Sequence, residues 1–157
     1  MSAAAVVGVD IGTGSARAVA IDREGSVVAV STAPYPDTAP MPIGEMDPSA
    51  WLGGVVTVLA GLGVDRPTAI CVGGHGPSTV DAAGRLAITF RHPAGYGAGD
   101  VAPHAAHAAV LRERFGPGSH PRRMWDYAVG RLGAGDGLQS VWPSQEPLDG
   151  YGDPVAT

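Results

Sequence analysis

One acidic side chain, followed by a turn of small residues, is the part of this sequence best suited to chemistry. Asp10 ends an apolar run, and Gly12, Thr13, Gly14 and Ser15 follow before apolar residues alternate again. The backbone amides of such a turn can hydrogen-bond phosphate oxygens, because glycine lets the chain approach a ligand closely. A neighbouring carboxylate can hold Mg²⁺, directly or through water, since this ion takes few carboxylates and keeps several waters. The alternative is a plain hairpin in which Asp10 only accepts hydrogen bonds from turn amides.

The segments around this turn indicate an α/β domain. Alternating apolar residues predict short strands over residues 6–10, 16–22 and 26–32, joined by connections of hairpin length. A Pro-rich loop follows. Asp47 and Pro48 then form a helix start, because the aspartate can accept from free amides and proline suits the first helical position.

The remaining elements are predicted with less regular spacing. The helix that starts at Pro48 is expected to run to about residue 61, and its two glycines at 53 and 54 suggest close packing. A buried strand is expected over residues 68–74, followed by a hairpin. Helices are expected over 103–115 and 124–132.

Composition excludes several classes of protein. The chain has 157 residues, of which 45% are hydrophobic and 16% charged, with a net charge of −5. Such a chain is too hydrophobic to be disordered and too acidic to coat nucleic acid. It contains no apolar run of membrane-spanning length and no basic leader of a signal peptide. We therefore expect a cytoplasmic domain that binds neither nucleic acid nor membrane.

Three ordered sequence blocks resemble the N-terminal domain of FGGY-type carbohydrate kinases. They are GVDIGTGSARAVAIDREGSVVAV, GEMDPSAW and AICVGGHGPSTVDAAGRLAITF, within residues 5–95. Members of that family typically show D-[IL]-G-T-[TS]-S followed by a basic residue, here Arg17, then a D-P-x-x-W helix start and a G-Q or G-H block. The order of elements also resembles the opening of the actin-like, ribonuclease H-like ATPase fold, with a mixed sheet that begins with three hairpin-connected strands and has flanking helices.

The resemblance implies phosphorylation of a sugar or polyol hydroxyl by ATP with Mg²⁺. It assigns Asp10 to the metal and the turn at 12–15 to the ATP phosphates. The partners implied are ATP and a small sugar or polyol, and a homodimer is left open. Sugar contacts are implied for two groups of residues: Gly74, His75 and Gly76, and Phe90, Arg91 and His92.

Two departures from the family pattern affect this interpretation. Many members carry W-N-D-x-R where this chain has FRHPAG, so a cation and an imidazole replace an amide and a carboxylate. The family's general base lies in a G-D-[NQ] motif, which is missing here: Asp100 and Asp136 each end a GAGD but lack the following residue, and we interpret both as loop aspartates.

We therefore expect residues 1–157 to be an incomplete N-terminal domain, without a catalytic residue of their own and without the C-terminal adenine-binding domain. Such a chain is expected to be inactive alone and to expose apolar surface. One alternative is a non-catalytic remnant or interaction module of the same fold. Another is a different actin-like ATPase, which the DPSAW helix and the GGHG block disfavour.

Histidines and arginines in the second half suggest no further site. His104 and His107 are three residues apart on a predicted helix, but zinc needs more ligands at defined spacing, so we interpret them as solvated. Arg112, Arg114, Arg122 and Arg123 are likewise interpreted as a solvated surface rather than a nucleic-acid face.

Overall fold

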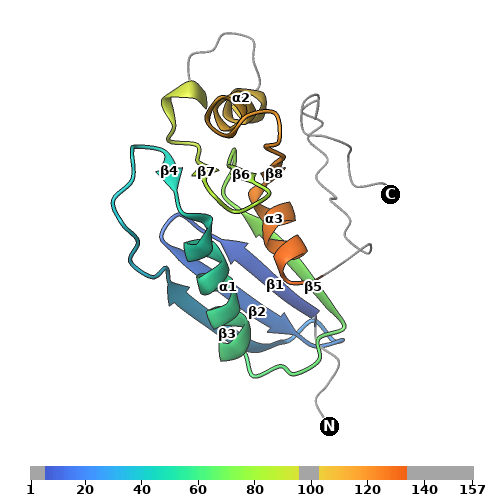
Figure 1. Cartoon of the computed structure of the whole chain (residues 1–157). Helices are drawn as coiled ribbons and strands as arrows, with labels where there is room; N and C mark the ends of the chain where they lie inside the picture. Colours follow the sequence, from blue (N-terminus) through green and yellow to red (C-terminus); the bar gives the residue numbers. More distant parts are fainter. Residues whose placement is uncertain (1–5, 96–102, 134–157) are drawn as a thin grey trace. The chain divides into compact units, whose positions relative to one another are not determined.

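The computed structural model describes residues 6–95 and 103–133. Within it the chain forms two compact units, and the path of the chain through them can be followed in Figure 1. Unit 1 comprises Met1–Thr38 and Ser49–His75, and unit 2 comprises Ala39–Pro48 and Gly76–Thr157. Because each unit is built from two separate segments, each is described by itself.

Unit 1 contains a mixed four-stranded sheet and one helix. The strand order is β3-β2-β1-β5, with β1 antiparallel to β2 and parallel to β5. This arrangement confirms the predicted opening of three hairpin-connected strands. The elements are β1 (Val6–Ile11), β2 (Ser15–Ile21), β3 (Val27–Pro34), α1 (Pro48–Gly61) and β5 (Ala69–Gly74).

The core of unit 1 follows from alternation along its strands. Every second side chain of β1 and β2 is buried, because successive residues of a strand point to opposite faces of the sheet. On α1, buried side chains recur at helical spacing, which places them on one face of the helix. The buried residues are Val7, Val9, Ile11, Ala16, Ala18, Ala20, Trp51, Val55 and Val58.

A glycine in α1 allows the helix to lie close to its neighbours. A Cβ atom added to Gly54 would lie 2.7 Å from the ring of Tyr35 and 3.3 Å from the Cβ atom of Ala16. The close packing expected from the glycines is therefore confirmed at Gly54. At Gly53 an added Cβ atom would make only an ordinary contact, 3.7 Å from Pro36.

The strand β5 forms where it is predicted but is not buried. Ala69, Ile70 and Cys71 are exposed, and Ile70 keeps 41% of its surface. Within the described residues β5 pairs only with β1, so its apolar side chains lack the cover that a second neighbouring strand would provide. An apolar run alone does not distinguish a central strand from an edge strand.

Unit 2 contains a small antiparallel sheet of order β4-β7-β6-β8. Its core includes Leu86, Ile88 and Leu111, with Phe115 packed against them. Both predicted helices and the predicted hairpin of β6 with β7 are confirmed. The elements are β4 (Glu45–Met46), β6 (Thr79–Asp81), β7 (Ala87–Ile88), η1 (Pro93–Gly95), α2 (Pro103–Phe115), β8 (Pro121–Arg123) and α3 (Met124–Arg131).

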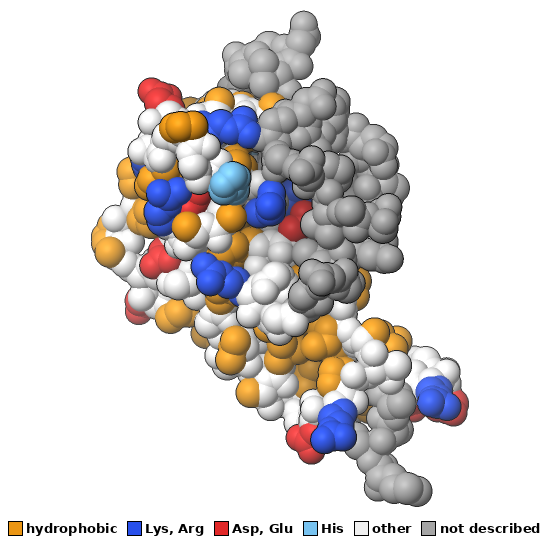
Figure 2. Space-filling model, turned by 45° about the vertical axis from the view of Figure 1, so that its right-hand side comes forward, with side chains coloured by type: hydrophobic (Ala, Val, Ile, Leu, Met, Phe, Trp, Pro, Cys, Tyr) orange, Lys and Arg blue, Asp and Glu red, His pale blue; other side chains and the backbone are white. Residues whose placement is uncertain are grey.

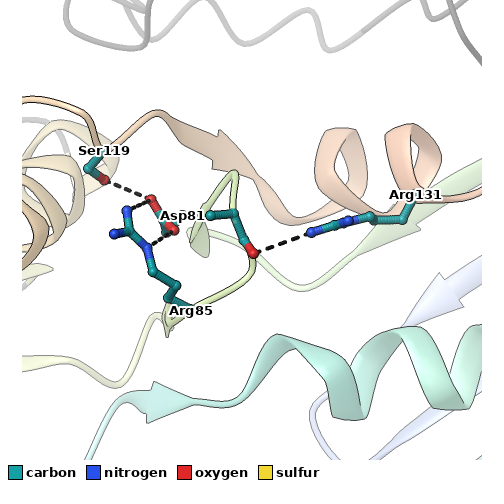
Figure 3. Close-up of polar contacts among 5 residues, drawn as sticks. Asp81, Arg85, Ser119 and Arg131 are labelled. Atoms are coloured by element: carbon teal, nitrogen blue, oxygen red, sulfur yellow. Dashed lines mark hydrogen bonds and ion pairs between the residues drawn. The ribbon is translucent and has the colours of Figure 1, made fainter.

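A buried carboxylate holds the β6–β7 hairpin together (Figure 3). Arg85 donates from Nε and from a terminal nitrogen to the two oxygens of Asp81, at 2.7 and 2.9 Å, and Ser119 donates at 2.9 Å. The guanidinium also lies over the ring of Phe115, 4.1 Å from its centre. These bonds hold the pKa of Asp81 below its ordinary value, with the bond from Arg85 the largest cause. Asp81 therefore has a structural role in this hairpin.

Two interpretations of charged residues in unit 2 are wrong. His104 and His107 are 7% and 0% exposed, so they are buried rather than solvated. Their Nδ1 atoms lie 3.0 and 3.5 Å from Oγ1 of Thr79 on β6, because α2 packs against this sheet with its histidine face inward. Burial lowers the pKa of each to about 4. Arg123 is also buried, at 5% exposed, next to the ring of Trp125.

Arg114 is partly exposed and pairs with an acidic side chain. Arg114 at the end of α2 makes two hydrogen bonds to Glu45 of β4, at 2.6 and 2.8 Å. Figure 2 shows the blue side chains of one face standing apart from each other, with hydrophobic and acidic ones between them.

Candidate functional site: the turn between β1 and β2

The predicted phosphate turn is a tight hairpin at the end of the first two strands. Ile11 of β1 faces Ala16 of β2, and the N–H of Gly12 donates to the carbonyl of Ser15 at 3.0 Å. Thr13 and Gly14 form the exposed tip. A Cβ atom on Gly12 would lie 3.0 Å from the carbonyl oxygen of Ser15, so any residue other than glycine would require this carbonyl to shift by a few tenths of an ångström.

Tyr35, the residue after β3, contacts this turn. Its hydroxyl donates to the carbonyl oxygens of Gly12 and Ser15, at 2.8 and 3.0 Å. Its backbone N–H donates to the carbonyl oxygen of Gly14 at 3.4 Å. Burial raises the pKa of Tyr35, and the charge of Asp10 raises it further. Sequence reasoning missed this residue, because position 35 lies in a segment interpreted only as a Pro-rich loop.

Asp10 lies beside the turn with its carboxylate in solvent. It is on the face of the sheet opposite the buried Val9 and Ile11, and it is exposed. Its direct neighbour across the ladder is Arg17 of β2, the basic residue of the motif. One carboxylate oxygen lies 3.9 Å from the position of a Cβ atom on Gly12. Among the described residues the Asp10 carboxylate makes no salt bridge.

The end of β5 lies next to the same turn. Gly74 is the register partner of Ile11, and the N–H of His75 donates to the carbonyl of Ile11 at 3.1 Å. The His75 ring meets Trp51 of α1 edge to face, with 5.5 Å between ring centres. Unit 1 therefore brings together the metal-ligand candidate, the phosphate turn and the first two residues predicted to contact sugar.

The other predicted sugar residues lie in unit 2. Gly76 lies near the ring of Trp125, and the guanidinium of Arg91 lies 5.6 Å from the ring centre of Phe90. His92 precedes η1, where its Nδ1 accepts from the N–H of Ala94 at 3.2 Å. This bond leaves the ring's Nε2 as the N–H donor in the neutral tautomer, so His92 cannot accept through Nδ1 from a sugar hydroxyl.

Glycine at position 44 lets the backbone of its loop lie directly against the backbone of His92. Gly44 has φ of +82°, and a Cβ atom there would overlap the backbone of His92. Its carbonyl accepts from the N–H of Thr89 at 2.7 Å. Glycine is therefore required at position 44, both for the left-handed backbone and for the close approach.

The two GAGD aspartates, Asp100 and Asp136, lie outside the described residues. Within the described ranges no group of three or more His, Cys, Asp or Glu side chains is arranged to hold a metal ion. An Mg²⁺ held by one carboxylate, phosphate oxygens and water needs no such group. None of the helices in the described part of the chain is long and apolar enough to cross a membrane.

Several solved structures of sugar kinases share the fold of this chain. A xylulose kinase from Rhodospirillum rubrum matches with a TM-score of 0.62 and 24% identity, over 80% of this chain and 33% of the kinase. A xyloylose kinase from Brucella ovis matches with a TM-score of 0.64 and 19% identity, over 80% of this chain and 33% of that kinase. A xylulose kinase from Bifidobacterium adolescentis matches with a TM-score of 0.56 and 18% identity, over 92% of this chain and 36% of that kinase. The chain thus spans about a third of the length of these kinases.

These matches confirm the resemblance to sugar kinases at the level of the fold. No protein-family model matches the sequence. A search of curated proteins gave no significant match. The substrate and the roles of individual residues therefore have to be argued from the site itself.

Proposed function

We propose that this chain supplies the phosphate and Mg²⁺ site of an ATP-dependent kinase acting on a sugar or polyol hydroxyl, within an actin-like, ribonuclease H-like fold. The observation that carries the proposal is the turn at 12–15, with Asp10 exposed beside it and the end of β5 adjacent.

The residues of unit 1 have distinct roles in this proposal. The amides of Thr13, Gly14 and Ser15 bind phosphate oxygens, and glycine at positions 12 and 14 lets the backbone approach them. Asp10 would hold Mg²⁺, which when bound neutralises phosphate charge and helps to align the phosphates. The end of β5, with Gly74 and His75, would present the sugar close to the transferred phosphoryl group.

A non-catalytic role is the second candidate, and the segment 90–92 favours it. Where the family has a side chain that faces substrate, His92 here caps η1 through Nδ1. Arg91 lies over the neighbouring Phe90 ring. A chain with an intact phosphate turn and an altered sugar segment would bind nucleotide without transferring phosphate.

Calorimetric titration of the 157-residue chain with ATP, in Mg²⁺ and in EDTA, tests the phosphate site. We expect Asp10→Asn to abolish the Mg²⁺-dependent part of the affinity, a loss of at least about tenfold, because a charge-assisted contact contributes about 1.5–3 kcal/mol. The matched control is Asp37→Asn, an exposed aspartate in the loop after Tyr35. Equal affinity of wild type and Asp10→Asn in Mg²⁺ would contradict the metal role.

A further inference from the structure

We propose that Tyr35 is a positioning residue that sets the direction of the amides in the turn at 12–15. This inference rests on the proposed function, because it assigns how the phosphate-binding surface is held. The hydroxyl and the N–H of Tyr35 together contact three carbonyl oxygens of the turn, those of Gly12, Gly14 and Ser15.

The geometry of the peptide group converts these contacts into an orientation. In a trans peptide the C=O of one residue and the N–H of the next point in opposite directions. Tyr35 draws the carbonyls of Gly12 and Gly14 toward itself. The N–H groups of Thr13 and Ser15 must therefore point away from the Tyr35 groups that bind these carbonyls, and the proposal places the phosphate on that side.

Both ends of the tyrosine side chain are fixed. The hydroxyl has two acceptors, at 2.8 and 3.0 Å. The ring lies against Gly54 of α1, where a Cβ atom would come within 2.7 and 2.8 Å of two ring carbons. Glycine inside a helix costs about 1 kcal/mol relative to alanine, and the space needed by this ring explains its presence.

The ionisation state of Tyr35 supports the same role. Burial and the nearby charge of Asp10 raise its pKa, so the hydroxyl keeps its proton in the neutral range. A phenolate could not donate to carbonyl oxygens.

The first test removes only the hydroxyl. Titration of the full chain with inorganic tripolyphosphate and Mg²⁺ is followed by NMR of the backbone amides. We expect Tyr35→Phe to weaken binding about five- to tenfold, since two carbonyls lose their shared donor. In the free protein the amide signals of Thr13 and Ser15 should shift. The matched control, Tyr127→Phe, removes a tyrosine hydroxyl from unit 2 and should change neither.

The second test keeps the hydroxyl and displaces the ring. Gly54→Ala places a methyl group against the Tyr35 ring, whereas Gly53→Ala has 3.7 Å to its nearest neighbour. Alanine favours the helix equally at both positions. We expect Gly54→Ala to weaken tripolyphosphate binding by a similar factor and Gly53→Ala to leave it unchanged. The comparison of Gly54→Ala with Gly53→Ala also tests the positioning role if Tyr35→Phe fails to fold.

The outcomes separate the two proposals. If wild type binds tripolyphosphate and both Tyr35→Phe and Gly54→Ala bind it equally well, the positioning role is overturned and the phosphate site stands. If wild type binds none at millimolar concentration, the phosphate site is overturned, and the role of Tyr35 with it. Weaker binding with shifted Thr13 and Ser15 amide signals in both variants supports the role.

Discussion

At the scale of single residues, the polar groups buried in unit 2 were hidden from the sequence. His104 and His107 face inward from α2 toward Thr79, and among the residues that the structure describes the buried Nε2 of His107 has no hydrogen-bond partner. Two histidines three residues apart on a helix give the same sequence pattern whether the face they share is exposed to solvent or buried. Only the packing of α2 on β6 settles which.

These histidines should make the protein sensitive to acid. The pKa of each is lowered from 6.5 to about 4 by burial, so between these values the unfolded chain binds more protons than the folded one. The free energy of unfolding should therefore fall as pH drops from 6.5 to 4, by at least about 2 kcal/mol. Denaturant titrations at several pH values measure this change.

The control for acid sensitivity is an exposed histidine. His120→Gln should keep the full pH dependence of the wild type, whereas the double variant His104→Gln with His107→Gln should lose most of it. An unchanged slope between pH 6.5 and 4 in the double variant would show that other groups cause the acid sensitivity.

In the candidate site, too, features set by neighbouring residues could be predicted from the sequence, and contacts between residues far apart in the sequence could not. The tight turn at 12–15 and the position of Asp10 beside it could be predicted, because both are set within six consecutive residues. Their metal and phosphate roles stay predictions. Tyr35 could not be predicted, since it reaches the turn only through the pairing of β3 with β2. The sugar-contact roles of Phe90, Arg91 and His92 stay predictions.

At the scale of elements, the strand and helix positions were largely predictable. Strands β1, β2 and β3 begin or end within two residues of the expected places, and α1 runs from Pro48 to Gly61 as expected. Alternation, a Pro start and hairpin turns are local signals. The exposure of β5 was not predictable, because it depends on which strands lie beside it.

The β6–β7 hairpin shows what one motif of the family resemblance does physically. In the sequence DAAGR, Asp81 accepts from Arg85, and Gly84 makes the turn with φ of +77°. The N–H of Gly84 donates to the Asp81 carbonyl at 2.7 Å, and Arg131 of α3 donates to the carbonyl of Ala83 (Figure 3). These contacts give the motif a structural role in the turn.

Asp81→Asn should therefore lower the free energy of unfolding by about 1–3 kcal/mol, because charged acceptors are replaced by a neutral amide in a buried position. The pKa of Asp81 is lowered from 3.8, so this stability is present above pH 3.8 and is lost as pH falls below it. Denaturant unfolding at pH 7 checks the loss, with the exposed Asp65→Asn as control. Equal stability of Asp81→Asn and wild type would contradict the role.

At the scale of the whole chain, the apolar surface expected from the sequence is present. Val27, Val28 and Val30 of β3 are 61%, 51% and 66% exposed, and Figure 2 shows hydrophobic side chains at the surface. Val28 and Val30 lie on one face of this strand, at the edge of the described sheet. Single exposed apolar residues are normal, but an edge strand that carries several is suited to further packing.

We expect the chain alone to bind Mg²⁺ and ATP and to phosphorylate no sugar. The sequence contains no G-D-[NQ] motif, and general acid–base help typically contributes about 10²–10⁴-fold to rate. A coupled assay of ADP release with a panel of pentoses, hexoses and polyols measures this. Turnover above the background rate of ATP hydrolysis would show that the chain carries its own base.

The division of the chain into units has a practical consequence for anyone who clones it. The backbone passes between the units after Thr38, after Pro48 and after His75. A stop codon after His75 would leave β4 attached without β7, its ladder partner. Isolating unit 1 thus calls for excision of the ten residues Ala39–Pro48 and a short Gly/Ser splice, with a new first turn designed for α1.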